Sequence, residues 1–243
     1  MIRLIPNLII EDRNAVKRNK FLPYKYLGDP FNIVKILNDK CIDELIITNI
    51  SGLNEQEVSY IKKLNGICFM PLCYGGGITT FDQAINVMSV GIERIHINTL
   101  IYQNFNEFEK IVNHLGGSSV VAVVNIKRKN GHYNYSSSCG TYVVDADIIK
   151  IIQRLIKTNV SEIMFNIVDD ENSKSGYDKN FIEFINSLPK YNYLLNGGLN
   201  KSNVRGISDQ KMLSNYKSIN GFVGSNYFFC RGKFDGVLIS YEK

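Results

Sequence analysis

The sequence predicts a single-domain (β/α)8 TIM barrel, and three observations lead to this fold class. Short apolar segments typical of strands alternate regularly with helical segments, which is the pattern of a parallel sheet. Eight such units fit into 243 residues, close to the roughly 250 residues usual for this fold. Similar segments recur about 120 residues apart, as Tyr74–Ile78 and Asn196–Leu199 illustrate. We therefore expect two similar half-barrels, 1–116 and 117–243.

The first half opens on a strand in which Arg3, Asn7 and Ile9 share one face. The polar segment that follows is longer than ordinary connections, and we expect it to be a functional loop. Asp29 and Pro30 predict the N-cap and the first position of a helix. The expected strands are Met1–Ile10, Asp43–Asn49, Cys68–Tyr74 and Glu93–Asn98, the loop is Glu11–Gly28, and the helices are 30–40, Glu55–Leu64, Thr80–Ser89 and Asn104–Leu115.

The second half repeats the alternation, with one insertion between its first strand and its first helix. Asn130 and Gly131 lie in that insertion and give the strongest hairpin signal in the chain. The expected strands are Ser119–Ile126, Glu162–Val168, Asn192–Asn196 and Ser218–Gly224, and the helices are Asp145–Lys157, Lys179–Leu188 and one after Lys201.

Composition narrows the classes of function. The net charge of +5 is spread along the chain without a basic run interleaved with aromatics, so nucleic-acid binding is not indicated, and acidic or phosphorylated small molecules are favoured. No apolar run approaches the roughly 18 residues of a membrane span, and no secretory leader is recognisable. The five cysteines lack C-x-x-C spacing, which argues against a disulfide framework or a zinc site. We expect a cytoplasmic protein with no metal and no cofactor; the cysteines are Cys41, Cys68, Cys73, Cys139 and Cys230.

Four charged residues stand at the starts of predicted strands: Arg3, Glu44, Arg94 and Glu162. If they face inward, they form a ring of two acids and two bases at the N-terminal end of the barrel. Lone inward charges would be very costly, whereas alternating pairs can satisfy one another. Surface salt bridges at the strand starts are the alternative interpretation.

The next inward layer is expected to contain Asn7, Thr48, His96 and Asn166, where branched aliphatic residues normally dominate this fold. Such a layer implies a polar barrel interior, because buried amides need partners or water. His96 taken alone is better explained as a core histidine with its hydrogen bonds satisfied. As part of the layer, it is expected to line the interior.

The C-terminal end, where barrel enzymes place their catalysts, lacks an evident acid and base. Ile9 and Asn125 lie at the corresponding ends of strands one and five, and neither side chain titrates. No Ser/His/Asp or Cys/His nucleophile set is found. The remaining titratable candidates near this rim, most of them expected to be solvated loop charges, are Lys17, Asp169, Asp170, Glu171 and Asp178.

Glycines follow several strands and could bring backbone amides close to phosphate groups. Two such sites, one in each half, would suit an elongated bisphosphorylated ligand. Tight turns between strands and helices explain the glycines equally well. The phosphate-binding candidates are Lys17, Gly76, Gly77, Asn98, Thr99, Gly197, Gly198, Gly224 and Ser225.

Taken together, these motifs resemble the cyclase subunit of imidazole glycerol phosphate synthase, the HisF family, over nearly the whole chain. The matching segments are Arg3-x-Ile-Pro, Gly28-Asp-Pro30, Ile42-Asp-Glu-Leu45, Tyr74-Gly-Gly-Gly-Ile78, Ile97-Asn-Thr99, Lys174-Ser-Gly-Tyr-Asp178 and Asn196-Gly-Gly198.

The resemblance implies a barrel that docks a glutaminase on its N-terminal face and receives ammonia through a ring of four charges. Arg3, Glu44, Arg94 and Glu162 match that ring, and Glu93 matches a position that contacts the glutaminase. Ammonia would then travel through the barrel to the opposite end.

The departures from the family concern its chemistry. The family places catalytic aspartates where this chain has Ile9 and Asn125, and Glu171-Asn172 replaces the usual Asp-Gly of a phosphate-side loop. The first-loop lysine is retained as Lys17. Loss of one catalytic proton carrier typically costs about 10²–10⁴-fold in rate, so ordinary cyclase turnover is not expected.

A further motif, Phe21-x-Pro-x-x-Tyr-x-Gly-Asp-Pro30, is similar to paralogues associated with amidation of surface-glycan sugars. In those systems a glutaminase and a HisF-like barrel supply ammonia to a sugar amidotransferase that makes acetamidino groups. The leading hypothesis is therefore a barrel that conducts ammonia and stimulates its glutaminase. The alternatives are an active cyclase that uses substitute acids such as Asp169 or Glu171, and a regulatory barrel that binds a phosphosugar without ammonia transport.

Overall fold

The computed structural model describes residues 3–17, 25–40, 42–129, 132–137, 142–143, 147–167, 179–197 and 219–224. The predictions for Asp169, Asp170, Glu171, Asp178, Gly198, Ser225, the Lys174–Asp178 motif, Cys41, Cys139, Cys230 and the helix after Lys201 fall outside these residues.

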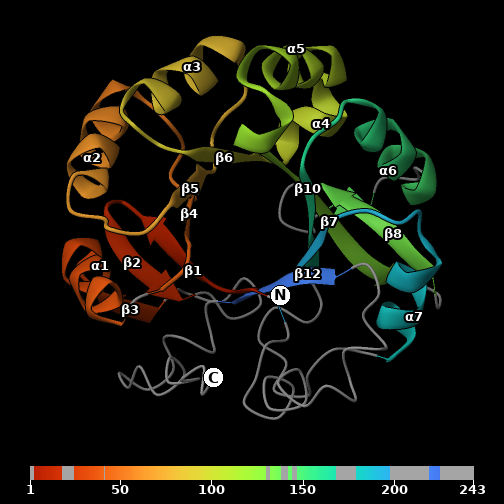
Figure 1. Cartoon of the computed structure of the whole chain (residues 1–243), viewed down its shortest axis with the longest axis horizontal. Coiled ribbons are helices and arrows are strands. Elements are labelled where there is room, and N and C mark those ends of the chain that lie inside the picture. Colours follow the sequence, from red (N-terminus) through yellow and green to blue (C-terminus); the bar gives the residue numbers. More distant parts are fainter. Residues whose placement is uncertain are drawn as a thin grey trace.

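Eight parallel strands close into a barrel with helices outside it (Figure 1), which confirms the expected fold class. The last strand pairs with the first, Arg3 opposite Gly221, and the ring is completed by pairing between the fifth and sixth barrel strands. In order around the barrel, the strands are β1 (Arg3–Glu11), β4 (Leu45–Asn49), β5 (Leu72–Gly75), β6 (Arg94–Ile97), β7 (Val120–Lys129), β10 (Glu162–Ile167), β11 (Tyr193–Asn196) and β12 (Ile219–Gly224).

The first helix begins where the sequence predicts it, whereas the helix expected from Asp145 begins at Ile148 and the short helix Thr99–Gln103 was not expected. Asp29 caps the first helix by accepting a hydrogen bond from the Phe31 amide at 3.4 Å, and Pro30 is the first helical residue. Thr80 and Gln83 form a reciprocal capping box at the third. The helices are α1 (Pro30–Asp39), α2 (Glu55–Asn65), α3 (Phe81–Ser89), α4 (Thr99–Gln103), α5 (Phe105–Leu115), α6 (Ile148–Lys157) and α7 (Lys179–Ser187), with a 3-10 turn at Gly117–Ser119.

The segment expected to be a loop after the first strand is partly a β-ribbon, so that prediction was wrong in part. β2 (Asn14–Lys17) pairs antiparallel with the end of β1 and with β3 (Lys25–Gly28). The turn between β1 and β2 has positive φ at Asp12 and Arg13, 48° and 63°, without the glycine that usually marks such turns. Its contacts with α2 offset the strain: the Arg13 Nε lies 2.9 Å from a carboxylate oxygen of Glu57.

Two further strands extend the insertion of the second half. β8 (His132–Ser137) pairs antiparallel with β7, Lys129 opposite His132, and β9 (Tyr142–Val143) pairs with β8. This pairing confirms the expected hairpin, although Asn130 and Gly131 themselves lie outside the described residues. In Figure 1 the β8 strand lies outside the ring of barrel strands, between α6 and α7.

The apolar core is divided into an outer and an inner part. The outer part packs the barrel strands against the surrounding helices, with side chains such as Leu45, Ile47 and Phe108. The inner part belongs to the alternate strand positions, which face the barrel axis. It contains Ile5, Ile46, Cys73, Val121, Val123, Met164, Leu194 and Val223.

Candidate functional site

The four charged residues at the strand starts form a closed ring of ion pairs, which we call the collar: Arg3, Glu44, Arg94 and Glu162. A carboxylate oxygen of Glu44 lies 2.7 Å from Arg3 Nη1, and its other oxygen lies 3.0 Å from Arg94 Nη1. Glu162 pairs with Arg94 Nη2 at 2.5 Å and also with Arg3. Each acid therefore bridges both guanidinium groups, and the two acids are only 5% and 6% exposed.

The strand alternation explains why these side chains meet. Each stands at or next to the first residue of β1, β4, β6 or β10 and points toward the axis, so that charges of opposite sign neighbour one another. Arg94 is held further by the Ser118 carbonyl oxygen at 3.2 Å and the Ser161 hydroxyl at 3.3 Å. Burial alone would lower the pKa of Arg94, but the nearby carboxylates, Glu162 foremost, raise it above its ordinary value. The collar arginine therefore stays charged.

An apolar layer lies directly inside the collar, which corrects the expectation of a polar layer there. Ile5, Ile46 and Met164 follow the collar residues of their strands by two positions and are almost fully buried. Cys73 belongs to the same layer, and burial raises the pKa of its thiol, so the group is neutral. The interior is therefore hydrocarbon in its middle section and polar only beyond it.

The polar layer beyond the hydrocarbon contains a chain of asparagines that we call the asparagine ladder. Asn196 Nδ2 donates to Asn166 Oδ1 at 3.3 Å, and Asn166 Nδ2 donates to Asn125 Oδ1 at 3.1 Å. Asn125 Nδ2 in turn donates to Asn98 Oδ1 at 3.1 Å, and Asn98 Nδ2 donates to the Val123 carbonyl oxygen at 2.7 Å. Because the last donor ends on a backbone oxygen, which can only accept, the direction of the whole chain is fixed.

The other side of the polar layer joins Asn7, Thr48 and His96. Thr48 Oγ1 donates to Asn7 Oδ1 at 2.9 Å, and His96 Nε2 lies 3.1 Å from the Ile47 carbonyl oxygen. The ring of His96 lies against Gly75, where a Cβ would come within 2.5 Å of two ring carbons. Burial lowers the pKa of His96 to about 4, with a smaller opposing effect from the hydrogen bond to Ile47. The imidazole is therefore neutral at physiological pH.

We expect His96 to make stability fall in mild acid. Its folded pKa of about 4 lies below the ordinary value of 6.5, so its contribution is complete above pH 6.5 and is lost as the pH falls toward 4. The loss corresponds to about 3 kcal/mol, measurable by urea unfolding. His96→Gln should flatten this part of the profile, whereas the exposed His114→Gln should not. Identical profiles for wild type and His96→Gln would contradict the prediction.

The two positions at which the family resemblance implies catalytic aspartates differ in burial and in their neighbours. Asn125 is buried within the ladder, and Ile9 is half-buried on β1 opposite Val16 and Thr48. The side chains of the two hydrogen-bonded groups above include no carboxylate or ammonium. Two charged residues not predicted from sequence lie one step further out on the same strand faces, Glu11 beyond Ile9 and Lys127 beyond Asn125. Strand alternation is the signal that identifies both.

The glycines expected to bind phosphate have structural explanations of their own. A Cβ at Gly76 would lie 1.8 Å from the Asn49 carbonyl oxygen, and its φ is 94°. Gly76 is therefore required by the close passage of two backbone segments, whatever it binds. The phosphate role of the remaining described candidates stays a prediction. Lys17 ends β2, Asn98 precedes α4 as its N-cap residue, Thr99 begins α4, Gly77 and Gly197 have positive φ, and Gly224 ends β12.

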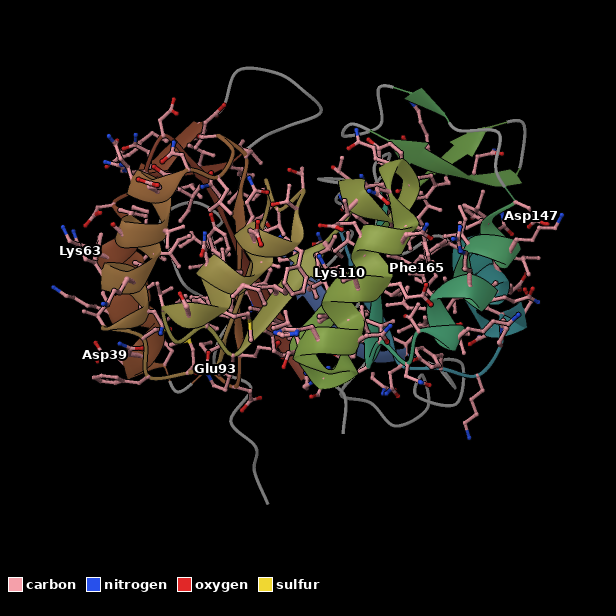
Figure 2. The ribbon with its side chains drawn as sticks, turned by 90° about the horizontal axis from the view of Figure 1, so that it is seen from above. Asp39, Lys63, Glu93, Lys110, Asp147 and Phe165 are labelled. Atoms are coloured by element: carbon pink, nitrogen blue, oxygen red, sulfur yellow. The ribbon has the colours of Figure 1, made fainter. Side chains whose placement is uncertain are left out.

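The N-terminal face carries Glu93, whose carboxylate accepts a hydrogen bond from the Leu72 amide at 2.9 Å. Its side chain is exposed next to the collar residue Arg94. Figure 2 places Glu93 on the same edge of the molecule as Asp39, at the C-terminal end of α1. Among the described residues, no group of three or more metal-ligating side chains is found. Nor does the described part contain a helix long and apolar enough to cross a membrane.

Comparison with known proteins assigns the chain to a family. A family model described as a histidine biosynthesis protein matches residues 3–221. A relative from Pseudomonas aeruginosa, provisionally named imidazole glycerol phosphate synthase subunit hisF2, is 35% identical over 245 residues, 98% of this chain and 95% of the relative. The chain belongs to the HisF family of imidazole glycerol phosphate synthase subunits.

Two further relatives are less similar to this chain. A provisionally named subunit hisF3 from Vibrio vulnificus is 28% identical over 244 residues, covering 98% of this chain and 92% of the relative. The subunit HisF of Exiguobacterium sibiricum is 26% identical over 202 residues, 82% of this chain and 81% of the relative. The chain is thus a divergent member of the HisF family.

Proposed function

We propose that this protein is the barrel subunit of a cytoplasmic glutamine amidotransferase complex, which docks a HisH-like glutaminase over the collar and conducts ammonia along the barrel axis. One observation carries the proposal: a ring of four charges closes the N-terminal end of the barrel, and along the axis it is followed by an apolar layer and then by a neutral polar layer. Barrel enzymes keep their catalysts at the C-terminal end, so the collar lies at the end away from any such catalysts and is free to serve as an entrance.

The three layers suit ammonia better than ammonium. An ion entering the apolar layer would lose its hydration, at a cost of several kcal/mol, whereas neutral NH₃ loses only hydrogen bonds. In the ladder, amide oxygens can accept hydrogen bonds from ammonia without protonating it. The collar must open for passage, because its ion pairs close a continuous cycle around the axis. Docking of the glutaminase is the event that we propose opens it.

Two features support a subunit without cyclase chemistry. The positions of the family's aspartates hold Ile9 and Asn125, and His96 remains neutral with a pKa of about 4. The acceptor that we propose for the ammonia is a sugar of a surface glycan, modified by a separate sugar amidotransferase. This last step depends on the resemblance of the Phe21–Pro30 segment to paralogues with that role.

The test measures two activities of the purified protein. With a HisH-like glutaminase, addition of the barrel should raise glutamine hydrolysis, and absence of both binding and stimulation would refute the proposal. With the formimino-ribulose-phosphate substrate and ammonium salt, cyclase turnover should lie about 10²–10⁴-fold below that of an active family member. The HisF subunit of Bacillus cereus, 26% identical to this chain, is a suitable reference.

Membership of the HisF family itself favours a second candidate function, that of an active cyclase in which other residues replace the missing catalytic aspartates. Glu11 and Lys127 stand beyond the polar layer on the inward faces of β1 and β7. Cyclase turnover close to that of the reference subunit, reduced by Glu11→Gln or Lys127→Met, would establish this candidate.

The third alternative is a regulatory barrel that binds a phosphosugar and does not transport ammonia. In that case, replacing Arg94 or Glu162 would leave coupled ammonia transfer unchanged.

A further inference from the structure

The N-terminal face presents one aromatic side chain that the fold leaves in water. Phe69 is 87% exposed in the connection between α2 and β5, and it is the most exposed of the large hydrophobic side chains in the described ranges. The strand expected to begin at Cys68 begins only at Leu72, so Phe69 precedes β5. An aromatic ring in that position contributes nothing to the packed core.

The backbone on both sides of Phe69 is held in place. Asn38, at the end of α1, accepts from the Phe69 amide at 3.0 Å and donates to the Ile67 carbonyl oxygen at 2.7 Å. The Cys68 amide donates to the Asn65 carbonyl oxygen at 3.0 Å. The aromatic ring therefore projects from a fixed turn, and little chain entropy remains to be lost when a partner covers it.

The same turn is attached to two strands of the collar. The Pro71 carbonyl oxygen accepts from the Leu45 amide at 3.0 Å, next to the collar residue Glu44. Glu93 binds the Leu72 amide at 2.9 Å. Three residues span at most about 10 Å, so Phe69 stands close to this side of the collar. We call Phe69, Pro71 and Glu93, all exposed on this face, the Phe69 patch.

We propose that Phe69 is the apolar anchor by which the HisH-like glutaminase docks on this barrel, an inference that rests on the proposed function. A protein that delivers ammonia into the collar must cover this end of the axis, and the Phe69 patch lies beside that opening. Aromatic side chains held rigidly near the centre of an interface dominate binding energy. Glu93 supplies a neighbouring negative charge for a cationic group of the partner.

The experiment measures the affinity of the purified barrel for a recombinant glutaminase subunit of the imidazole glycerol phosphate synthase class by calorimetry. Phe69→Ala should raise the Kd about 30-fold or more, and Phe69→Leu should recover part of the affinity. The melting temperature should be unchanged, because the side chain is exposed. Tyr26→Ala is the matched control. Tyr26 is 59% exposed on β3, which pairs with β2, and β2 pairs with the C-terminal end of β1, so its loss should leave the Kd unchanged.

Asn38→Ala provides an independent test of the fixed turn. It removes no exposed contact but frees the backbone around Phe69, so binding should weaken by less than about tenfold. A Kd that is unchanged in both Phe69→Ala and Asn38→Ala, with wild type binding normally, would overturn the anchor while leaving the proposed function intact. Failure of the wild type to bind any glutaminase would overturn both. Wild-type self-association abolished by Phe69→Ala, without glutaminase binding, would assign the patch to a second copy and also overturn the proposal.

Discussion

Replacing Glu162 with glutamine should destabilise the protein by about 3 kcal/mol, because removal of one partner of a buried ion pair leaves charge uncompensated. Glu162 is 6% exposed and pairs with both Arg3 and Arg94. In the variant, two guanidinium groups would share the single carboxylate of Glu44. Arg3 remains partly exposed, which limits the cost. Urea unfolding of the two proteins at neutral pH measures the difference.

Glu93, which is exposed on the same N-terminal face, provides a matched control. Glu93→Gln makes the identical chemical change at an exposed carboxylate whose hydrogen bond from Leu72 an amide oxygen can also accept. Its effect should stay within about 0.5 kcal/mol. Equal losses for Glu162→Gln and Glu93→Gln would show that the collar contributes no more than a surface charge. High salt should not greatly reduce the loss measured for Glu162→Gln, since a largely buried pair is weakly screened.

Replacement of the entire collar by apolar residues separates stability from function. Buried ion pairs can often be exchanged for hydrophobic side chains without loss of stability, so such a variant should fold at least as well as the Glu162→Gln protein. It should nevertheless fail to pass glutamine-derived ammonia to the sugar amidotransferase that we propose as its partner. Unimpaired transfer would contradict a gating role. The four substitutions are Arg3→Met, Glu44→Leu, Arg94→Met and Glu162→Leu.

The collar could be predicted from sequence because each of its members stands at a strand start, where alternation alone decides which way a side chain points. The polar layer does not lie directly inside the collar, because on β1, β4 and β10 the polar residue follows the collar residue by four positions and an apolar side chain stands between them. Only β6 differs, since barrel strands are staggered. His96 follows Arg94 by two residues and pairs with Gly75, whereas Thr48 follows Glu44 by four and also pairs with Gly75.

Other parts of the site depend on contacts between distant segments. The ladder consists of Asn98, Asn125, Asn166 and Asn196. Only the closed barrel shows that their side-chain amides are hydrogen-bonded to one another. The ribbon after β1 was missed because Asp12 and Arg13 form its turn without glycine. The strand expected from Cys68 begins only at Leu72, because Asn38, distant in sequence, holds the segment around Phe69 in a turn.

Asn125→Asp should create an acid that resists ionisation rather than restore a catalytic aspartate. The new carboxyl would face the Oδ1 of Asn98, which lies 3.1 Å from the present Asn125 Nδ2. Asn98 cannot turn to donate without losing its 2.7 Å hydrogen bond to the Val123 carbonyl oxygen. Two facing oxygens in a buried position disfavour the charged form, so the pKa of the introduced carboxyl should lie well above the ordinary 3.9 or so.

The sign of the stability change follows from that shift. Because the folded pKa is raised, Asn125→Asp should cost little below about pH 4 and progressively more as the pH rises through the folded pKa. At pH 7 the loss should reach about 2 kcal/mol, read from urea unfolding between pH 4 and 8. Adding Asn98→Ala removes the facing oxygen and should shrink the pH-dependent part. Ile9→Asp, at a half-buried position, should show a smaller pH-dependent loss than Asn125→Asp.

Cyclase activity should therefore not return with Asn125→Asp alone. A neutral carboxyl could donate a proton, but no base would stand at Ile9 to accept one, and each missing proton carrier costs about 10²–10⁴-fold. Turnover of the formimino-ribulose-phosphate substrate should rise measurably only when Ile9→Asp and Asn125→Asp are combined. Full activity of the single variant would mean that another group already supplies the base, with Glu11 on the same face of β1 as the first residue to replace.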